Sequence, residues 1–320
     1  MNPDVFLSAD TFLQTLLFGV TIGAVYALIA LGYTLVYGII ELINFAHGDL
    51  FMLGSFGALT ILEITVVNRN HLPIPPWLGV FLALVIPMAF CATLNVLIER
   101  VAYRRLRHAP RLAPLISAIG MSFILINIGL WWRGANPQSF PLLLNVFGND
   151  NLLGGLTGPD FDVRFTLKDL TVILVTIPLL LLLNFVVFRT NIGKAMRATA
   201  QDREAAALMG INVDRTIAFT FLLGGALAGA AGLIFGIYTG SSHFLRGFDA
   251  GLKAFTAAVL GGIGNLYGAT LGGFLIGIMS AFSDRVFDNR WTNATIFAIL
   301  IIVLVFRPSG LLGEQTVEKV

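Results

Sequence analysis

The sequence is poor in charged residues, which make up 12% of its 320 residues against 57% hydrophobic ones. That charged fraction is about half of the usual one, so the chain has too few polar side chains to cover a water-soluble surface. Its apolar residues lie in continuous runs such as LTVILVTIPLLLLLNFVVF, from Leu170 to Phe188. Strands of a membrane barrel would alternate instead. The composition therefore predicts an all-α polytopic membrane protein, and nothing in it indicates binding to nucleic acid.

Cysteine and catalytic motifs are also scarce. The single cysteine, Cys91, excludes an internal disulfide. The histidines are scattered, and no HExxH, CxxC or GxSxG spacing occurs, so neither a metal site nor a hydrolase is indicated. The one Gly-Lys pair, Gly193 and Lys194, lacks the upstream glycine of a P-loop. We therefore expect no ATP hydrolysis by this chain and no metal or cofactor of its own.

Hydropathy predicts about eight full crossings, because a bilayer core of about 30 Å needs roughly 20 apolar residues per helix. The predicted spans lie near Thr11–Leu31, Phe51–Val67, Trp77–Ile98, Leu112–Trp132, Leu170–Phe188, Thr216–Tyr238, Tyr267–Phe282 and Thr292–Phe306.

Two further apolar stretches, Gly32–Asn44 and Leu252–Gly262, are too short to span as single helices and are candidate broken or re-entrant segments. Each follows a span rich in small residues and precedes a span punctuated by glycine, which indicates a weak internal parallel repeat. If both segments cross, there are about ten membrane elements and both termini are cytoplasmic. If both only re-enter, there are about eight and both termini lie outside. We favour ten, because a repeat implies equivalent elements.

Basic residues set the orientation. Two segments, Arg100–Arg111 and Arg189–Arg215, are rich in arginine and lysine and belong in the cytoplasm. The loop between them, at 134–168, carries Asp150, Asp160 and Asp162 and is expected on the outer side.

Polar residues interrupt the apolar pattern in the stretch ELINFAHGD, which contains Glu41, Asn44, His47 and Asp49. A charge at the centre of a bilayer helix costs about 2.5–3.5 kcal/mol even on translocon-insertion scales, so these groups should face protein, water or an interface. Either they belong to a helix break that lines a path through the membrane, or the segment emerges at the cytoplasmic surface. In the second short segment, the close glycines 261, 262 and 264 would loosen a helix and let backbones approach.

The second basic segment predicts a short cytoplasmic helix from Lys194 to Met209, because it is rich in strong helix formers and is followed by Gly210 and Asn212. A modest apolar side could come from Ala195, Met196, Ala206, Leu208 and Met209. Such a helix would dock into a groove of a partner or lie on the bilayer surface.

The same helix contains Glu204-Ala205-Ala206, three residues and then Gly210, which resembles the EAA coupling motif of permeases in bacterial ATP-binding-cassette (ABC) importers. The Leu-Pro that often ends this motif is absent. From about Phe18 to Val320 the chain also resembles the H-type permease of the branched-chain amino-acid (Liv) transporter family. The similarity rests on GVTIGAVYALIALGYTLVYGII, INFAHGD, IERVAYR, LISAIGMS, GLKAFTAAVLGGIG and RPSGLLG.

This resemblance implies a single permease domain, 1–320, in the bacterial inner membrane, with a coupling loop at 190–215 and a periplasmic loop at 134–168. Its partners would be a homologous M-type permease, two ATPase subunits that hold ATP and Mg, membrane lipid and a periplasmic binding protein that delivers Leu, Ile or Val. The residues implied in ATPase coupling are Arg197, Asp202, Glu204, Ala205, Ala206 and Gly210. Those expected along the substrate path are Asn44, Phe45, His47, Gly48, Asp49, Gly261, Gly262 and Gly264.

Two alternatives remain open. The same kind of importer could carry urea, amides or other neutral amino acids. A secondary transporter driven by protons or sodium would need buried carboxylates, for which Glu41, Asp49 and Glu63 are the candidates.

Overall fold

The protein is described here by a computed structural model that covers residues 9–42, 44–67, 75–107, 109–110, 112–141 and 163–313. His71, His108 and the three aspartates of the 134–168 loop lie outside these described residues. The helices are α1 (Ala9–Ile40), α2 (Ala46–Leu62), η2 (Glu63–Val67), α3 (Pro76–Ile98), η3 (Glu99–Tyr103), η4 (Arg104–Leu106), α4 (Leu112–Arg133), α6 (Leu167–Arg189), α7 (Asn191–Gln201), α8 (Arg203–Leu208), α9 (Val213–Thr239), α10 (Arg246–Gly261), α11 (Leu266–Phe287) and α12 (Asn289–Phe306). Two short strands, β1 (Gln138–Ser139) and β2 (Ser241–Ser242), pair antiparallel.

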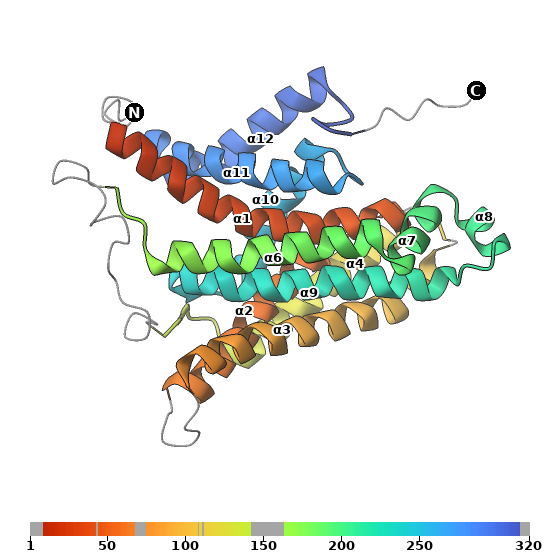
Figure 1. Ribbon diagram of the computed structural model, residues 1–320, viewed down its shortest axis with the longest axis horizontal. Coiled ribbons are helices and arrows are strands. Elements are labelled where there is room, and N and C mark those ends of the chain that lie inside the picture. Colours follow the sequence, from red (N-terminus) through yellow and green to blue (C-terminus); the bar gives the residue numbers. More distant parts are fainter. Residues whose placement is uncertain are drawn as a thin grey trace.

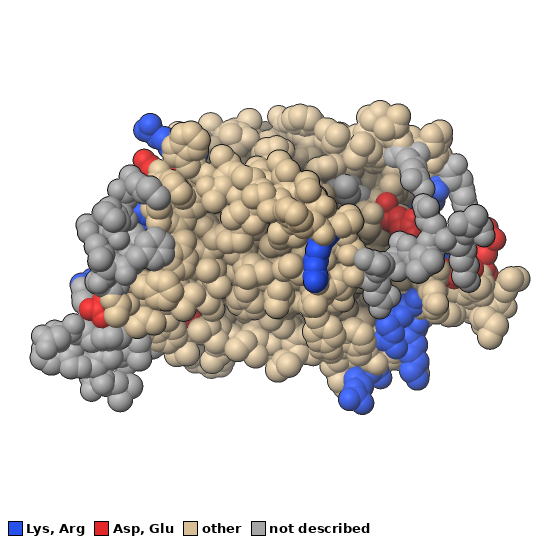
Figure 2. Space-filling view, turned by 90° about the horizontal axis from the view of Figure 1, so that it is seen from above, with Lys and Arg blue, Asp and Glu red and all other residues tan. Residues whose placement is uncertain are grey.

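The predicted fold class is confirmed. Within the described ranges, 8 helices are long and apolar enough to cross a membrane, and they contain the predicted spans. The long helices run side by side along the long axis of the molecule (Figure 1). On the face drawn in Figure 2, most charged side chains lie toward the two ends of that axis and a broad uncharged band separates them. This distribution suits a bundle whose middle lies in hydrocarbon.

The two ends of the bundle carry different elements. At one end, called the α8 end below, lie α7 and α8 (Figure 1). There, Arg203 of α8 donates hydrogen bonds from Nε and Nη2 to the backbone oxygen of Ile39, at 3.1 and 2.7 Å, so α1 finishes at this end. The β1–β2 pair follows the far end of α9 and marks the opposite end, called the β end. The first residues of α1 therefore lie at the β end.

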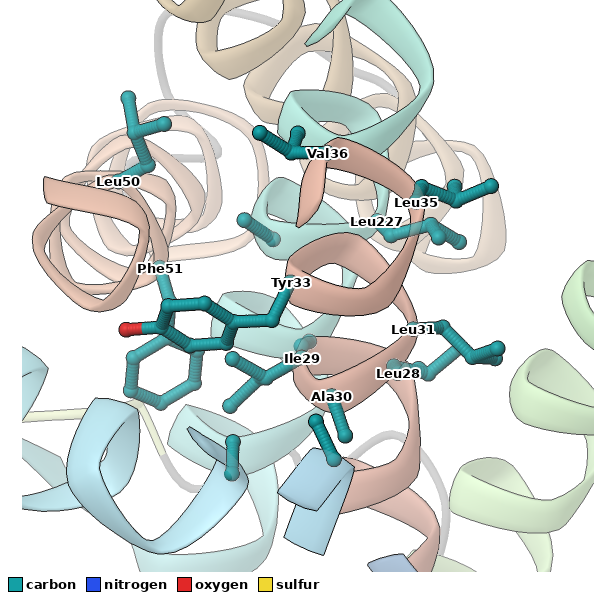
Figure 3. Packing of buried hydrophobic residues seen from close by; sticks show 14 of the residues in the cluster. Leu28, Ile29, Ala30, Leu31, Tyr33, Leu35, Val36, Leu50, Phe51 and Leu227 are labelled. Atoms are coloured by element: carbon teal, nitrogen blue, oxygen red, sulfur yellow. The ribbon is translucent and has the colours of Figure 1, made fainter. Parts of the chain in front are cut away.

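Helix α1 forms the centre of the core. Nearly every side chain from Thr21 to Val36 is buried, and the helix packs mainly against α11, α9 and α10. Figure 3 shows its Leu, Ile and Val side chains pointing in several directions, and the Tyr33 ring lies 4.8 Å from the His47 ring at the start of α2. A helix that is apolar on all sides is typical of a position enclosed by other helices.

Glycine allows this core to pack closely. A Cβ atom placed on Gly277 of α11 would lie 2.2 Å from the Cα atom of Gly23 in α1, so no larger residue fits there. Gly54 of α2 and Gly229 of α9 meet in the same way. Apolar side chains gain little from leaving lipid for a protein interior, so close backbone contact between small residues supplies much of the attraction between membrane helices.

The structure corrects the prediction for the first short segment. Gly32–Ile40 is not a separate element but continues α1 without a break. Gly32 does not interrupt the helix, because its missing side chain makes room for the His47 imidazole. The chain turns only after Ile40, where Glu41 takes a φ of 56° and its N–H donates to the Tyr37 oxygen at 2.7 Å.

The second short segment belongs to α10, a helix of 16 residues that is about 24 Å long. It runs from the β end toward the α8 end and stops at Gly262, where φ is 108°. Gly38 packs against Gly264, so the ends of the two predicted segments do lie side by side. With α10, the described part of the chain has one element more than its 8 candidate spans, close to the expected ten. The two predicted short segments are therefore not equivalent, because the first continues α1 and the second belongs to a separate helix, α10.

Candidate functional site

The predicted cytoplasmic helix is two helices, α7 and α8, joined at Asp202. The Oδ1 atom of Asp202 accepts hydrogen bonds from the backbone N–H groups of Glu204 and Ala205, both at 2.9 Å. An aspartate with this geometry caps the start of a new helix and ends the preceding one. The prediction of one continuous helix from Lys194 to Met209 was therefore wrong, because capping at Asp202 outweighs the helix propensity of its neighbours.

Helix α7 is fixed to the end of α6. The Thr190 hydroxyl caps it by accepting from the Gly193 N–H at 3.1 Å, and Arg197 donates to the backbone oxygen of Val187. Arg197 also lies over the Phe188 ring, 5.4 Å from its centroid. Because Met196 is buried as well, this half of the predicted apolar side faces the protein interior.

Helix α8 projects from the α8 end with an apolar tip. Ala206 is buried, whereas Leu208 and Met209 are 88% and 84% exposed. Gly210 takes a φ of 83°, and the N–H groups of Gly210 and Ile211 donate to Ala207 and Ala206 at 3.0 Å. A glycine in this conformation is the usual end of a helix. The tip is thus held in place by a cap on each side.

Three of the polar residues in the predicted path are buried in the interior. Asn44, His47 and Asp49 are all at most 2% exposed. Tyr103 donates to the Asn44 oxygen at 2.7 Å, and Asn95 donates to the backbone oxygen of Phe221 at 2.7 Å. Asn44 donates from Nδ2 to the Asn95 Oδ1 atom at 3.4 Å, so the network joins the segment before α2 to α3, η3 and α9, rather than lining an exposed wall.

Asp49 is the most unusual of the three. It lies in the first turn of α2, where a carboxylate is favoured by the helix dipole, and Ser122 of α4 donates to its Oδ2 atom at 2.5 Å. Its Oδ1 atom is buried and has no hydrogen-bond partner among the described residues. Next to it, Gly48 packs directly on Gly247 and Gly251 of α10. Asp49 thus lies where α2, α4 and α10 meet.

Phe45 and the glycine cluster have packing partners in the same region. Phe45 is half-buried, with its ring 6.3 Å from that of Phe255 in α10. Gly261 lies against the backbone of Gly268, and Gly262 against that of Gly313. Gly264, at a φ of 92°, lies beside Gly38.

The chain after α12 also returns to this turn. The N–H groups of Leu311 and Leu312 donate to the oxygens of Leu260 and Gly261, both at 2.9 Å. The glycines therefore form a turn that holds the C-terminal RPSGLLG segment. No local pattern predicts this contact between segments that are distant in the chain.

Sequence reasoning also missed a charged cluster beside α8. Glu99 is fully buried and pairs with Arg107 and Arg104. Arg107 also pairs with Asp214 at the start of α9, at 2.6 Å. The signal was present in IERVAYR, since an acid within a basic segment implies an ion pair. In the described part of the chain, no group of three or more His, Cys, Asp or Glu side chains could hold a metal ion.

Comparisons with known proteins agree with the resemblance. No solved structure matches the chain. The permease protein BraD of the Pseudomonas aeruginosa high-affinity branched-chain amino acid transport system is 42% identical over 97% of this chain and 98% of its own length. LivH of Escherichia coli K12, from the corresponding system, is 41% identical over the same shares. The probable LivH of Methanocaldococcus jannaschii is 30% identical over 89% of this chain and 88% of its own. Residues 15–304 match the family described as branched-chain amino acid transport system / permease component, and the chain belongs to this family of membrane permeases.

Proposed function

We propose that the chain is the membrane permease of an ABC importer that takes up Leu, Ile and Val. Its relatives in two bacteria are permeases of high-affinity branched-chain amino acid systems. This similarity supports both the proposed type of transporter and the proposed substrates. ATP and Mg bind to partner ATPase subunits, and this chain supplies the path and the contact through which hydrolysis is coupled to movement.

The observation that carries the proposal is the tip of α8. Helix α8 is capped at Asp202 and Gly210, and it exposes Leu208 and Met209 to water. Exposed apolar side chains on a fixed helix are typical of a surface that binds a partner protein. We assign this tip, with Glu204 and Ala205 beside it, to the ATPase groove. Ala206 anchors the tip from its buried side, and Arg197 fixes the preceding helix α7 to the end of α6. The 190–215 loop is therefore the coupling loop.

The proposed orientation puts the α8 end in the cytoplasm of a cell with an inner membrane, because the basic segments are at this end. Helix α1 then begins outside, and Gly313 lies inside. This replaces the expectation that both termini are cytoplasmic, since the continuous α1 removes one crossing. The 134–168 loop faces the periplasm, where the binding protein delivers substrate between this chain and its M-type partner.

The proposed path runs along the interior residues Asn44, His47 and Asp49, with Phe45 and Gly48 beside them and the turn at Gly261, Gly262 and Gly264 at its cytoplasmic end. In the conformation described, α4 covers Asp49 and α10 covers Gly48. Opening the path requires that these helices shift, as alternating access demands. Movement of α8 by the ATPase would reach α1 through Arg203 and Ile39.

The alternative of an ion-driven secondary transporter is favoured by one observation, the buried carboxylate of Asp49. Measuring leucine uptake by proteoliposomes that contain the complete complex distinguishes the ABC importer from the secondary transporter. Uptake of leucine that needs internal ATP and the binding protein supports the proposal, and uptake that persists with a proton or sodium gradient alone contradicts it. Competition by urea, amides and other neutral amino acids defines the cargo.

Two substitutions test the coupling assignment. Gly210→Pro cannot adopt a positive φ, and Glu204→Arg reverses an exposed charge beside the tip. Both should reduce uptake and substrate-stimulated ATP hydrolysis without changing the affinity of the binding protein for leucine. Arg285→Glu, a reversal of an exposed charge near the β end of α11, is the matched control. Normal uptake in both test variants would contradict the assignment.

A further inference from the structure

A pocket of about 600 Å³ opens at the α8 end, between the end of α1, the segment before α4, and Arg203 of α8. This volume is within the range of roughly 300–1,000 Å³ that small-molecule sites occupy. Its walls combine aliphatic side chains, Ile40, Leu42 and Leu115, with the Tyr37 phenol and with charges of both signs. The pocket is separate from the buried cluster around Asp49.

The negative charge is Glu41, which stands where a carboxylate is unfavourable for the fold. It follows directly on the C-terminal end of α1, where the helix dipole disfavours an acid. It also has a φ of 56°, a conformation that suits glycine and costs other residues energy. No ion pair to Glu41 occurs among the described residues. A residue whose charge and whose backbone conformation are both unfavourable at its position is a candidate for function.

The positive charge is Arg203. Its Nε and Nη2 atoms are held by the Ile39 oxygen, and a guanidinium has five N–H donors, so three remain. Among the residues that the structure describes, it has no carboxylate partner. The third charge, Arg107, is already neutralised by Glu99 and Asp214. Counting only ion pairs between described residues, the pocket thus offers one unpaired carboxylate and one unpaired guanidinium.

We infer that this pocket binds a zwitterionic α-amino acid with an aliphatic side chain from the cytoplasmic side, an inference that rests on the proposed cargo and orientation. Glu41 accepts hydrogen bonds from the ammonium group and Arg203 donates to the carboxylate. The aliphatic side chain packs on Ile40, Leu42 and Leu115. A phosphate would be repelled by Glu41, and an inorganic ion would leave the apolar wall unused. The site therefore holds the product of import next to the coupling helix.

The test is equilibrium dialysis of radiolabelled L-leucine with the purified complex of permeases and ATPases in lipid nanodiscs, without the binding protein. Saturable binding is expected, with a loss of at least tenfold in affinity in Glu41→Gly and in Arg203→Gln. Glu41→Gly is informative because glycine suits the positive φ, so lost binding cannot be attributed to misfolding. Arg105→Gln, an exposed arginine of the same end outside the pocket, should bind leucine normally.

Two analogues test the recognition of both charges. 4-Methylpentanoate lacks the ammonium group and 3-methylbutylamine lacks the carboxylate, so each should compete at least tenfold more weakly than leucine. The inference is overturned if wild type binds no leucine, if both pocket variants bind it normally, or if either analogue competes equally well. ATP-dependent leucine uptake by the same wild-type preparation, with the binding protein added, reports separately on the proposed function.

Discussion

Truncation of the α8 tip gives the sharpest test of the proposed coupling surface. Leu208→Ala removes three carbon groups from a side chain that is 88% exposed in the free permease. At about 0.8 kcal/mol for each buried CH₂ group, the loss on docking is roughly 2 kcal/mol, or about 30-fold in the affinity for the ATPase subunit. Because the side chain contacts little of its own chain, permease stability should change by less than about 0.5 kcal/mol.

The measurement is binding of the purified ATPase subunit to the permease in nanodiscs, together with the thermal stability of each variant. Leu181→Ala is the matched control, since Leu181 is 65% exposed but lies on the lipid-facing side of α6. An affinity within twofold of wild type for Leu208→Ala would refute the assignment of the tip. An equal loss in Leu181→Ala would show that the effect is not local to α8.

Three further predictions concern the bundle. Gly277→Val should destabilise the permease by about 1–3 kcal/mol or prevent its folding, because the α1 backbone occupies the space; Gly120→Val, with open space around it, should unfold at the wild-type temperature. Asn95→Ala should cost about 1–3 kcal/mol in denaturant titrations, because it leaves buried polar partners unpaired, and a loss below 0.5 kcal/mol would contradict the network. For orientation, Asp10→Cys should react with an impermeant maleimide in cells whose outer membrane alone is permeabilised, whereas Arg307→Cys should react only after the inner membrane is opened; the reverse pattern would invert the proposed topology.

Most of the membrane helices could be predicted from the sequence because lipid imposes a simple rule on them. Each needs a long apolar run, and Leu170–Phe188 and its counterparts satisfy this requirement without reference to the rest of the chain. The prediction failed where tertiary contacts determine whether a helix continues or ends. Gly32 would favour a break in isolation, but here it accommodates the His47 ring, and so α1 continues.

The candidate site could be predicted only where local sequence signals determine its structure. The exposed tip of α8 could be inferred, since Gly210 and the apolar residues before it are local signals. Asp202 was expected within one helix, although its side chain caps the next. That Glu41 and Arg203 line one pocket could not be inferred from their positions in the chain, because contacts among distant segments place them there.

The backbone contact between Gly23 and Gly277 has a mechanical consequence. Where helices touch through their main chains, no side chain can rotate to absorb a displacement. Helix α1 has 32 residues and a length of about 48 Å, which is enough to cross the membrane. Because it is packed in this way, it should resist bending and local displacement. In the proposed orientation, a force applied to the α8 end of α1 through Arg203 would be passed to its β end with little loss. The proposed ATPase contact and the proposed outer face of the permease would then be connected by one stiff helix.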